Sequence, residues 1–228
     1  MKRFWKEVAV GPDRVVALDG RPVRTPGRAP LAAPTDALAD AIADEWRAVG
    51  ETVDPRAMPL TGLANAAIDR VAPERDAFAA GLARYGESDL LCYRADGPAE
   101  LVARQAAAWD PPLDWARRRY DVHLAVATGV IHVAQPPATV ARLGEATAAL
   151  DAWTLAGLSP VVTITGSLVL ALALVEDAAD AETVWAAADL DEAWQGEQWG
   201  EDALAAQARE GRRREFDAAA RFLALVRG

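Results

Sequence analysis

The chain has few residues that could act as nucleophiles or metal ligands. It contains one cysteine, Cys92, and two histidines, His123 and His132. A cysteine hydrolase needs a nearby base that favours the thiolate, so one alternative is a hydrolase built on Cys92 and a histidine. Cys92 lies in the apolar run 90–93, which is more typical of a small buried residue. The histidines lack the spacing of a helical zinc pair, and no second cysteine is present, so we predict no metal site.

The sequence patterns of nucleotide-binding and acyl-transfer enzymes are also absent. The chain contains no Gly-x-x-x-x-Gly-Lys loop, no Gly-x-Gly-x-x-Gly turn and no Gly-x-Ser-x-Gly elbow. Without these patterns, the sequence gives no site for a phosphate group or an acyl intermediate. The residues alone therefore offer no catalytic residue and no cofactor site.

The segment 190–202 has an unusual composition. It places Trp194 and Trp199 among acids and amides, with almost no aliphatic residues. A core helix would carry Leu, Ile or Val at regular spacing, whereas a binding surface combines aromatic anchors with polar groups. Two alternatives stay open, because the tryptophans could pack between helices and the acids could belong to helix first turns. The segment is thus a candidate interaction surface.

The N-terminal residues 1–33 are predicted to form a small antiparallel β unit. Short apolar runs alternate with Gly, Pro and Asp, and Asp19-Gly20 separates two of the runs. An Asp-Gly pair in this position is typical of a two-residue hairpin, because both residues accept a positive φ. The alternation then changes at Pro34 to a helical period.

Most of the remaining chain is predicted to be helical. Thr35 is a candidate N-cap, and Trp46 lies on the apolar stripe that follows it, so a core role is favoured over a contact role for Trp46. Pro73 is predicted to open a helix, and a second hairpin is predicted over 122–133. The other predicted helices cover 98–109, 111–120, 137–156, 160–176, 180–188, 190–196 and 201–226. The fold class is α+β, with a β-rich N-terminal domain that has one or two helices, residues 1–85, and a larger all-helical C-terminal domain, residues 86–228.

Composition and charge limit the classes of partner and the compartment that we expect for this protein. The net charge of −10 and the pI of about 4.7 exclude a nucleic-acid-binding surface of the usual basic kind. The apolar run Val161–Val175 is shorter than the ~20 residues of a membrane helix, so we predict a buried core helix and no membrane insertion. A single cysteine and an N-terminus unlike a secretory signal favour a reducing compartment, the cytoplasm.

Several sequence blocks, in order along nearly the whole chain, resemble one family. The blocks are Arg3-Phe4-Trp5-Lys6, Leu18 to Pro26, Ala43 to Trp46, Met58 to Asn65, Asp89 to Arg94, Gln105 with Trp109-Asp110-Pro111, and Leu190 to Gly200. Together they are similar to the F1-ATP synthase alpha-subunit assembly chaperones. One departure is that Ala203 and Leu204 stand where members often carry another acid.

The resemblance implies an assembly chaperone and not an enzyme. Its members bind the unassembled F1 alpha subunit and shield the surface that faces beta until beta displaces them, without nucleotide hydrolysis. We expect the free chain to be a monomer, and the open alternative of a small-molecule carrier would use a Trp-lined site. The predicted partner-binding residues are Trp194, Trp199, Glu192, Gln195, Glu197, Glu201, Asp202 and Trp46.

Overall fold

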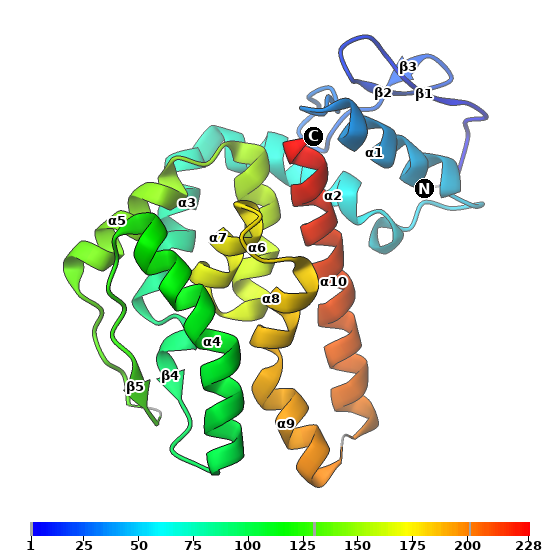
Figure 1. Ribbon diagram of the computed structural model, residues 1–228. Coiled ribbons are helices and arrows are strands. Elements are labelled where there is room, and N and C mark those ends of the chain that lie inside the picture. The colour runs from blue at the N-terminus through cyan, green and yellow to red at the C-terminus, as the bar shows by residue number, and fades with distance from the viewer. Residues whose placement is uncertain (1, 130, 201) are drawn as a thin grey trace. The chain divides into compact units, whose positions relative to one another are not determined.

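The computed structural model describes residues 2–129, 131–200 and 202–228 (Figure 1). Helices make up 65% of it, with a small strand sheet near the N-terminus and a larger helical region toward the C-terminus. This arrangement confirms the predicted α+β class.

Two compact units divide the chain. Unit 1 contains Met1–Arg75, Asp151–Gly157 and Ala218–Gly228, and unit 2 contains Asp76–Leu150 and Leu158–Asp217. Both units are discontinuous in sequence, and the division into residues 1–85 and 86–228 stays a prediction.

The sheet of unit 1 is a three-stranded antiparallel meander. Strands β1 (Val8–Val10), β2 (Val16–Leu18) and β3 (Arg21–Pro22) pair in that order. Asp19 and Gly20 join β2 to β3 with φ angles of 47° and 76°, the positive values that a tight hairpin turn requires. The Asp19 carboxylate accepts hydrogen bonds from the backbone N–H groups of Lys6 and Glu7. The predicted hairpin is therefore confirmed.

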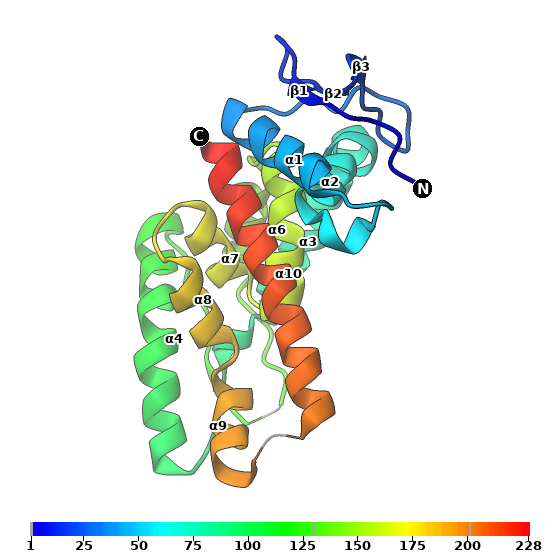
Figure 2. The same ribbon diagram turned by 90° about the vertical axis from the view of Figure 1, so that its right-hand side faces the viewer.

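Two helices complete the core of unit 1 (Figure 2). Helix α1 (Asp36–Ala48) begins at Thr35, whose hydroxyl accepts from the Leu38 N–H at 3.2 Å, as the sequence predicts. Helix α2 is Pro59–Ala66. The buried face of α1 packs on the sheet through Leu38 and Ile42, both fully buried. Burial of each such aliphatic side chain stabilises the fold by about 1.5–3 kcal/mol.

The helices and strands that follow α2 have these bounds: α3 Arg75–Ala83, β4 Tyr93–Arg94, α4 Ala99–Tyr120, β5 Ala127–Thr128, α5 Pro137–Ala148, α6 Ala152–Thr165, α7 Leu168–Val175, α8 Ala181–Ala188, α9 Leu190–Trp199 and α10 Ala203–Arg227. Single turns of other helix types lie at Pro55–Ala57, Ala67–Val71, Ala72–Glu74, Arg84–Glu87 and Leu90–Cys92. Residues of α6 and α10 are shared between the two units.

Helix α7 is the centre of unit 2. All residues from Leu168 to Leu174 are buried, and Ser167 caps the helix by accepting from the Leu170 N–H at 3.0 Å. The buried Asp89 carboxylate accepts from the Val169 N–H at 3.0 Å and so satisfies a second donor of the same first turn. In the part of the chain that the structure describes, no helix combines the length and apolarity needed to span a bilayer.

The secondary-structure predictions are wrong in three stretches of the chain. The helices predicted at 98–109 and 111–120 are one helix, α4, with Pro111 and Pro112 inside it. Its packing outweighs the local cost of proline, since Trp109 is fully buried and its Nε1 donates to the Ala187 carbonyl at 2.7 Å. The hairpin predicted at 122–133 is not found in the described residues of that stretch, which leave out residue 130: β5 pairs there in parallel with the distant β4.

The third correction concerns the stretch from 137 to 176. Two helices were predicted there, and three are present, α5, α6 and α7. Asp151 accepts from the Trp153 N–H and starts α6, while Gly166, with φ 65°, ends it before Ser167 caps α7.

Candidate protein-binding surface

The environment of Cys92 does not favour a nucleophile. The residue is 1% exposed, and burial raises the pKa of its thiol to about 12, with the Asp89 carboxylate adding to the effect. The thiolate that a hydrolase needs is therefore scarce at neutral pH. His132 Nδ1 lies 3.0 Å from the Tyr93 hydroxyl. Within the described residues, no group of three or more His, Cys, Asp and Glu could hold a metal ion.

Helix α9 presents its two tryptophans in different ways. Trp194 is 6% exposed and lies under the Arg104 guanidinium, which sits 4.7 Å from its ring centroid. Trp199, at the last position of the helix, is 79% exposed. The buried ring fixes α9 against α4, and the exposed ring is available for contact with another molecule.

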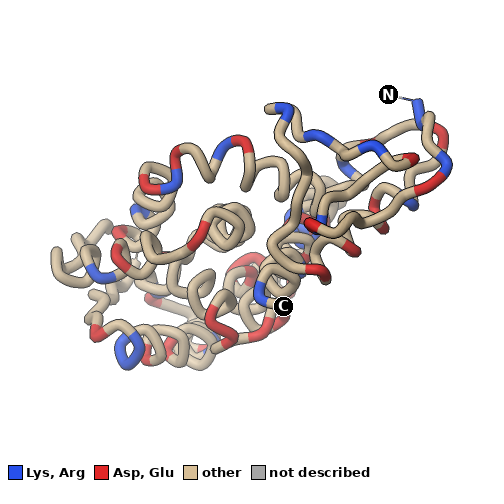
Figure 3. Tube along the Cα trace, turned by 90° about the horizontal axis from the view of Figure 1, so that it is seen from above, with Lys and Arg blue, Asp and Glu red and all other residues tan. Residues whose placement is uncertain are grey.

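The acids of α9 are paired within unit 2. Glu197 accepts from Arg104 Nη1 at 2.8 Å, and Arg104 Nη2 also donates to Glu100 at 2.9 Å. These hydrogen bonds raise the pKa of Arg104. Glu192 forms an ion pair with Arg212 of α10. Along the chain trace, acidic and basic positions are interspersed (Figure 3). Such exposed pairs contribute little to stability and exchange easily with a partner's charges.

A buried amide holds the start of α9 in place. Gln105 is 2% exposed, and its Nε2 donates to Asp191 Oδ1 at 2.8 Å. Its Oε1 accepts from the Ala95 N–H at 2.8 Å. A buried amide that both donates and accepts a hydrogen bond fixes the geometry of the elements it joins. It therefore links α4, the segment after β4, and α9.

The remaining predicted residues have separate roles. Asp202 Oδ1 accepts from the N–H groups of Leu204 and Ala205 at 2.8 and 3.1 Å, so it caps α10. Gln195 is exposed and lines a surface cavity of about 420 Å3 together with both tryptophans of α9. Glu201 lies outside the described residues.

Trp46 belongs to the core of unit 1. It is 8% exposed, and its ring meets that of Trp5 edge to face with centroids 5.3 Å apart. The sequence favoured this core role, and a contact role for Trp46 stays a prediction.

Other apolar side chains of unit 2 are exposed besides Trp199. Leu204 is 77% exposed at the start of α10, Ile131 is 78% exposed beyond β5, and Val102 is exposed in the first turns of α4. Trp199 ends α9 and Leu204 is in the first turn of α10, and Figures 1 and 2 show these two helix ends close together. Trp199 also lines the cavity of about 420 Å3. Sequence reasoning missed Ile131 and Val102. Such residues can be recognised in a sequence when an apolar residue lies off the buried stripe of its helix, as Leu204 does.

The family model described as ATP12 chaperone protein matches residues 2–117. The structure of Atp12 from Paracoccus denitrificans is 46% identical, covers 99% of this chain and 98% of its own, and superposes with a TM-score of 0.94. A mutant of P. denitrificans Atp12p is 45% identical over 99% of this chain and 97% of its own, with the same TM-score.

The Atu1473 protein of Agrobacterium tumefaciens is 42% identical over 98% of this chain and 85% of its own, with a TM-score of 0.90. These matches confirm the resemblance seen in the sequence blocks. The chain therefore belongs to the ATP12 chaperone family, and its role is that of an assembly chaperone for a protein client in ATP synthase assembly.

Proposed function

We propose that this chain binds the unassembled alpha subunit of F1-ATP synthase and covers its beta-facing surface until beta replaces it. The exposed pair Trp199 and Leu204, 79% and 77% exposed, is the observation that carries the proposal. Single exposed apolar residues are common, but an exposed Trp that lines a cavity, with an exposed Leu five positions further along the chain, is typical of a protein-binding surface.

The proposed chaperone mechanism needs only differences in binding affinity, and no energy from nucleotide hydrolysis. Interfaces between permanent subunits are more hydrophobic than ordinary surface, so an isolated alpha subunit would expose a patch that aggregates. The chaperone covers this patch with an affinity below that of beta. Beta then displaces it by mass action, and no nucleotide hydrolysis is required.

The residues in and near α9 have different roles in the proposed binding of the client. Trp199 is the proposed anchor, and Gln195 and Leu204 are further contacts around it. Trp194 is a positioning residue, because its ring is buried under Arg104. Glu192 and Glu197 form ion pairs with Arg212 and Arg104, so in our proposal a basic client group exchanges with them.

Such an exchange affects the association rate and the choice of partner more than the affinity. Asp202 extends this charged rim in the proposal, and Glu201 stays a predicted contact. The net charge of −10 acts in the same sense, since it attracts a basic client surface.

The cavity beside Trp199 fits a docking surface better than an enclosed carrier site. Small-molecule sites surround most of the ligand's surface. Here one of the two lining tryptophans stands 79% exposed, so it would leave one side of a ligand in water. A ligand screen by tryptophan fluorescence separates the two functions.

Capture of the client tests the proposal. F1 alpha is produced without beta, together with the tagged chain. The proteins that co-purify are identified and quantified by mass spectrometry. We expect alpha with wild type and at least tenfold less with Trp199→Ala, since a Trp hot spot is worth about 2 kcal/mol or more. Phe4→Ala removes another exposed aromatic, 66% exposed in unit 1, and serves as the matched control.

Two outcomes contradict the proposal. One is that wild type recovers no alpha, and the other is that Trp199→Ala and Phe4→Ala behave alike. We also infer that the free chain is a monomer in the bacterial cytoplasm. Sedimentation equilibrium checks the first inference, and fractionation of cells checks the second.

A further inference from the structure

A second cavity of unit 2, of about 950 Å3, runs along α4. The residues of α4 that line it recur at helical spacing from Arg104 to Arg118, a length of about 21 Å at 1.5 Å per residue. Helix α8 and the turn before it form the opposite wall, and Leu170 and Ala173 of α7 form the floor. Helix α4 packs on both α7 and α8. We call this cavity the α4–α8 groove.

The α4–α8 groove is lined mainly by small side chains, which leave room for bulky side chains of a partner. Seven of the lining residues are alanines, and Trp115 is the aromatic side chain among them. Ala107 and Ala186, on opposite walls, are exposed. Small side chains leave room for the large apolar side chains of another element, and a half-buried Trp offers an anchor. Both walls are helices, and among the residues that the structure describes no strand edge lines them. The groove therefore suits a helix laid along it rather than an added strand.

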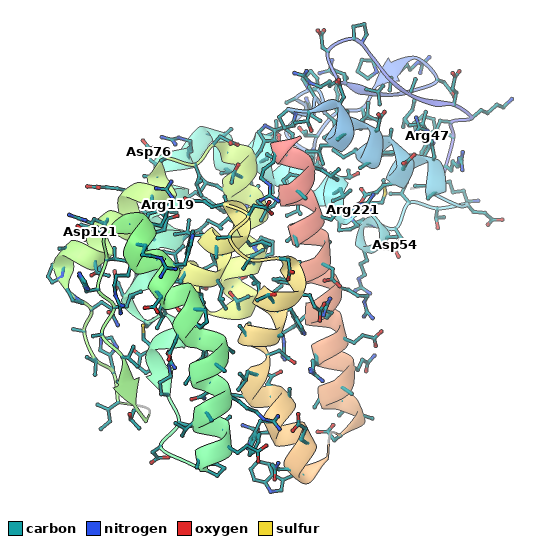
Figure 4. All side chains as sticks on the ribbon, in the orientation of Figure 1. Arg47, Asp54, Asp76, Arg119, Asp121 and Arg221 are labelled. Carbon is teal, nitrogen blue, oxygen red and sulfur yellow. The ribbon has the colours of Figure 1, made fainter. Side chains whose placement is uncertain are left out.

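The groove has an unpaired cation at one end. Arg118 is exposed and has no ion-pair partner in the described part of the chain, whereas its neighbours Arg117 and Arg119 pair with Asp114 and Glu176. Figure 4 shows Arg119, next to Arg118, near the C-terminal end of α4. A carboxylate on the partner would complement Arg118.

The middle of the α4 wall offers backbone acceptors. Pro111 and Pro112 carry no N–H, so the carbonyls of Ala107 and Ala108 lack the donors that a regular helix supplies four residues later. All four residues line the groove. A hydroxyl, amide or ammonium group on the partner could donate to these carbonyls.

We propose that the α4–α8 groove binds an amphipathic helix of the client, with an acidic residue in its first turn at the Arg118 end. The apolar face of this helix packs on Trp115 and the alanines, and acids are common in helix first turns because they complement the dipole. The inference rests on the proposed function, and it adds a second contact surface to that of Trp199.

The experiment uses the full chain and purified F1 alpha. Ala186→Arg fills the groove, and Ala141→Arg makes the same change at an exposed position of α5 outside the groove. Arg118→Glu reverses the charge at the end of the groove, and Arg118→Lys keeps it. Circular dichroism verifies that each variant is folded. Affinity for alpha is measured by biolayer interferometry.

We expect Ala186→Arg and Arg118→Glu each to weaken binding of alpha about tenfold or more, since they place a steric block and a like charge against the partner. Ala141→Arg and Arg118→Lys are expected to bind within about twofold of wild type. A benzophenone amino acid at position 107 is expected to cross-link alpha, and mass spectrometry should place the cross-link on an apolar helical segment that carries an acid.

The outcomes separate this inference from the proposed function. If wild type binds alpha but Ala186→Arg and Arg118→Glu bind equally well, the groove inference is overturned and the proposed function stands. A cross-link to a non-helical segment overturns the choice of a helix. If wild type does not bind alpha at all, the proposed function fails and this inference fails with it.

Discussion

Replacement of Asp89 by Asn tests how the centre of unit 2 is stabilised. The carboxylate is fully buried and accepts from the N–H groups of Leu91 at 3.1 Å and Val169 at 3.0 Å. Burial raises its pKa from 3.8 to about 6, even though these hydrogen bonds favour the charged form. The folded protein therefore binds a proton at Asp89 at a pH where the unfolded chain has released it.

The sign and size of the effect follow from this difference in pKa. Because the pKa of Asp89 is raised in the folded state, protonation of Asp89 stabilises the fold. This stabilisation is fully present below pH 3.8 and is lost as the pH rises through about 6. The full loss is about 3 kcal/mol at 1.36 kcal/mol for each pKa unit. Proton linkage gives about 1.4 kcal/mol of this loss between pH 5 and pH 8. Both values of pH lie above the pI of about 4.7.

Urea unfolding of wild type and Asp89→Asn at pH 5 and pH 8 measures the effect. The amide leaves one backbone N–H without an acceptor, which costs about 1–3 kcal/mol at either pH. Because Asn does not titrate, the free energy of unfolding of wild type minus that of the variant should be about 1.4 kcal/mol larger at pH 5 than at pH 8. A difference that is constant, or larger at pH 8, refutes the reasoning.

Three further substitutions and one chemical reaction test the packing. Trp109→Phe loses the bond to the Ala187 carbonyl and part of a buried ring, so we expect a free energy of unfolding about 2–4 kcal/mol lower in urea titrations, and an unchanged value would contradict the helix as described. Gly157→Ala should cost about 1–3 kcal/mol, because its Cβ would lie 2.8 Å from a side-chain carbon of α10. Gly81→Ala, where nothing lies within 4 Å, should instead raise the melting temperature, and equal behaviour of the two variants would disprove the close approach. Cys92 should react with a disulfide probe much more slowly in the native protein than in urea, and equal rates would show that the thiol is accessible.

Local signals predicted the parts of the fold that depend on near neighbours. The Asp19-Gly20 turn and the Thr35 cap each act within four residues, so the sequence specifies them directly. The parallel pairing of β4 with β5 joins residues more than thirty positions apart, and no short pattern encodes it. The sequence predicts two helices where α4 is one, because proline is common at helix starts. The burial of Trp109 keeps the helix continuous past Pro111, and this burial is a tertiary effect that local sequence does not encode.

The candidate surface was predicted in part for a similar reason. Composition pointed to α9, but it treated Trp194 and Trp199 alike. Five residues turn a helix by about 140°, so the two rings cannot share one face, and one is buried while the other is exposed. The pairing of Glu197 with Arg104 spans 93 positions and could not be anticipated from either residue alone.

Displacement by beta tests the central claim most directly. A complex of this chain with F1 alpha is isolated, purified beta is added without nucleotide, and the products are separated by size-exclusion chromatography. The account predicts that the chain is released as alpha joins beta, in amounts that rise with beta. A complex that keeps all three proteins together, or beta that fails to release the chain at any concentration, would contradict the claim that the chain covers the beta-facing surface of alpha.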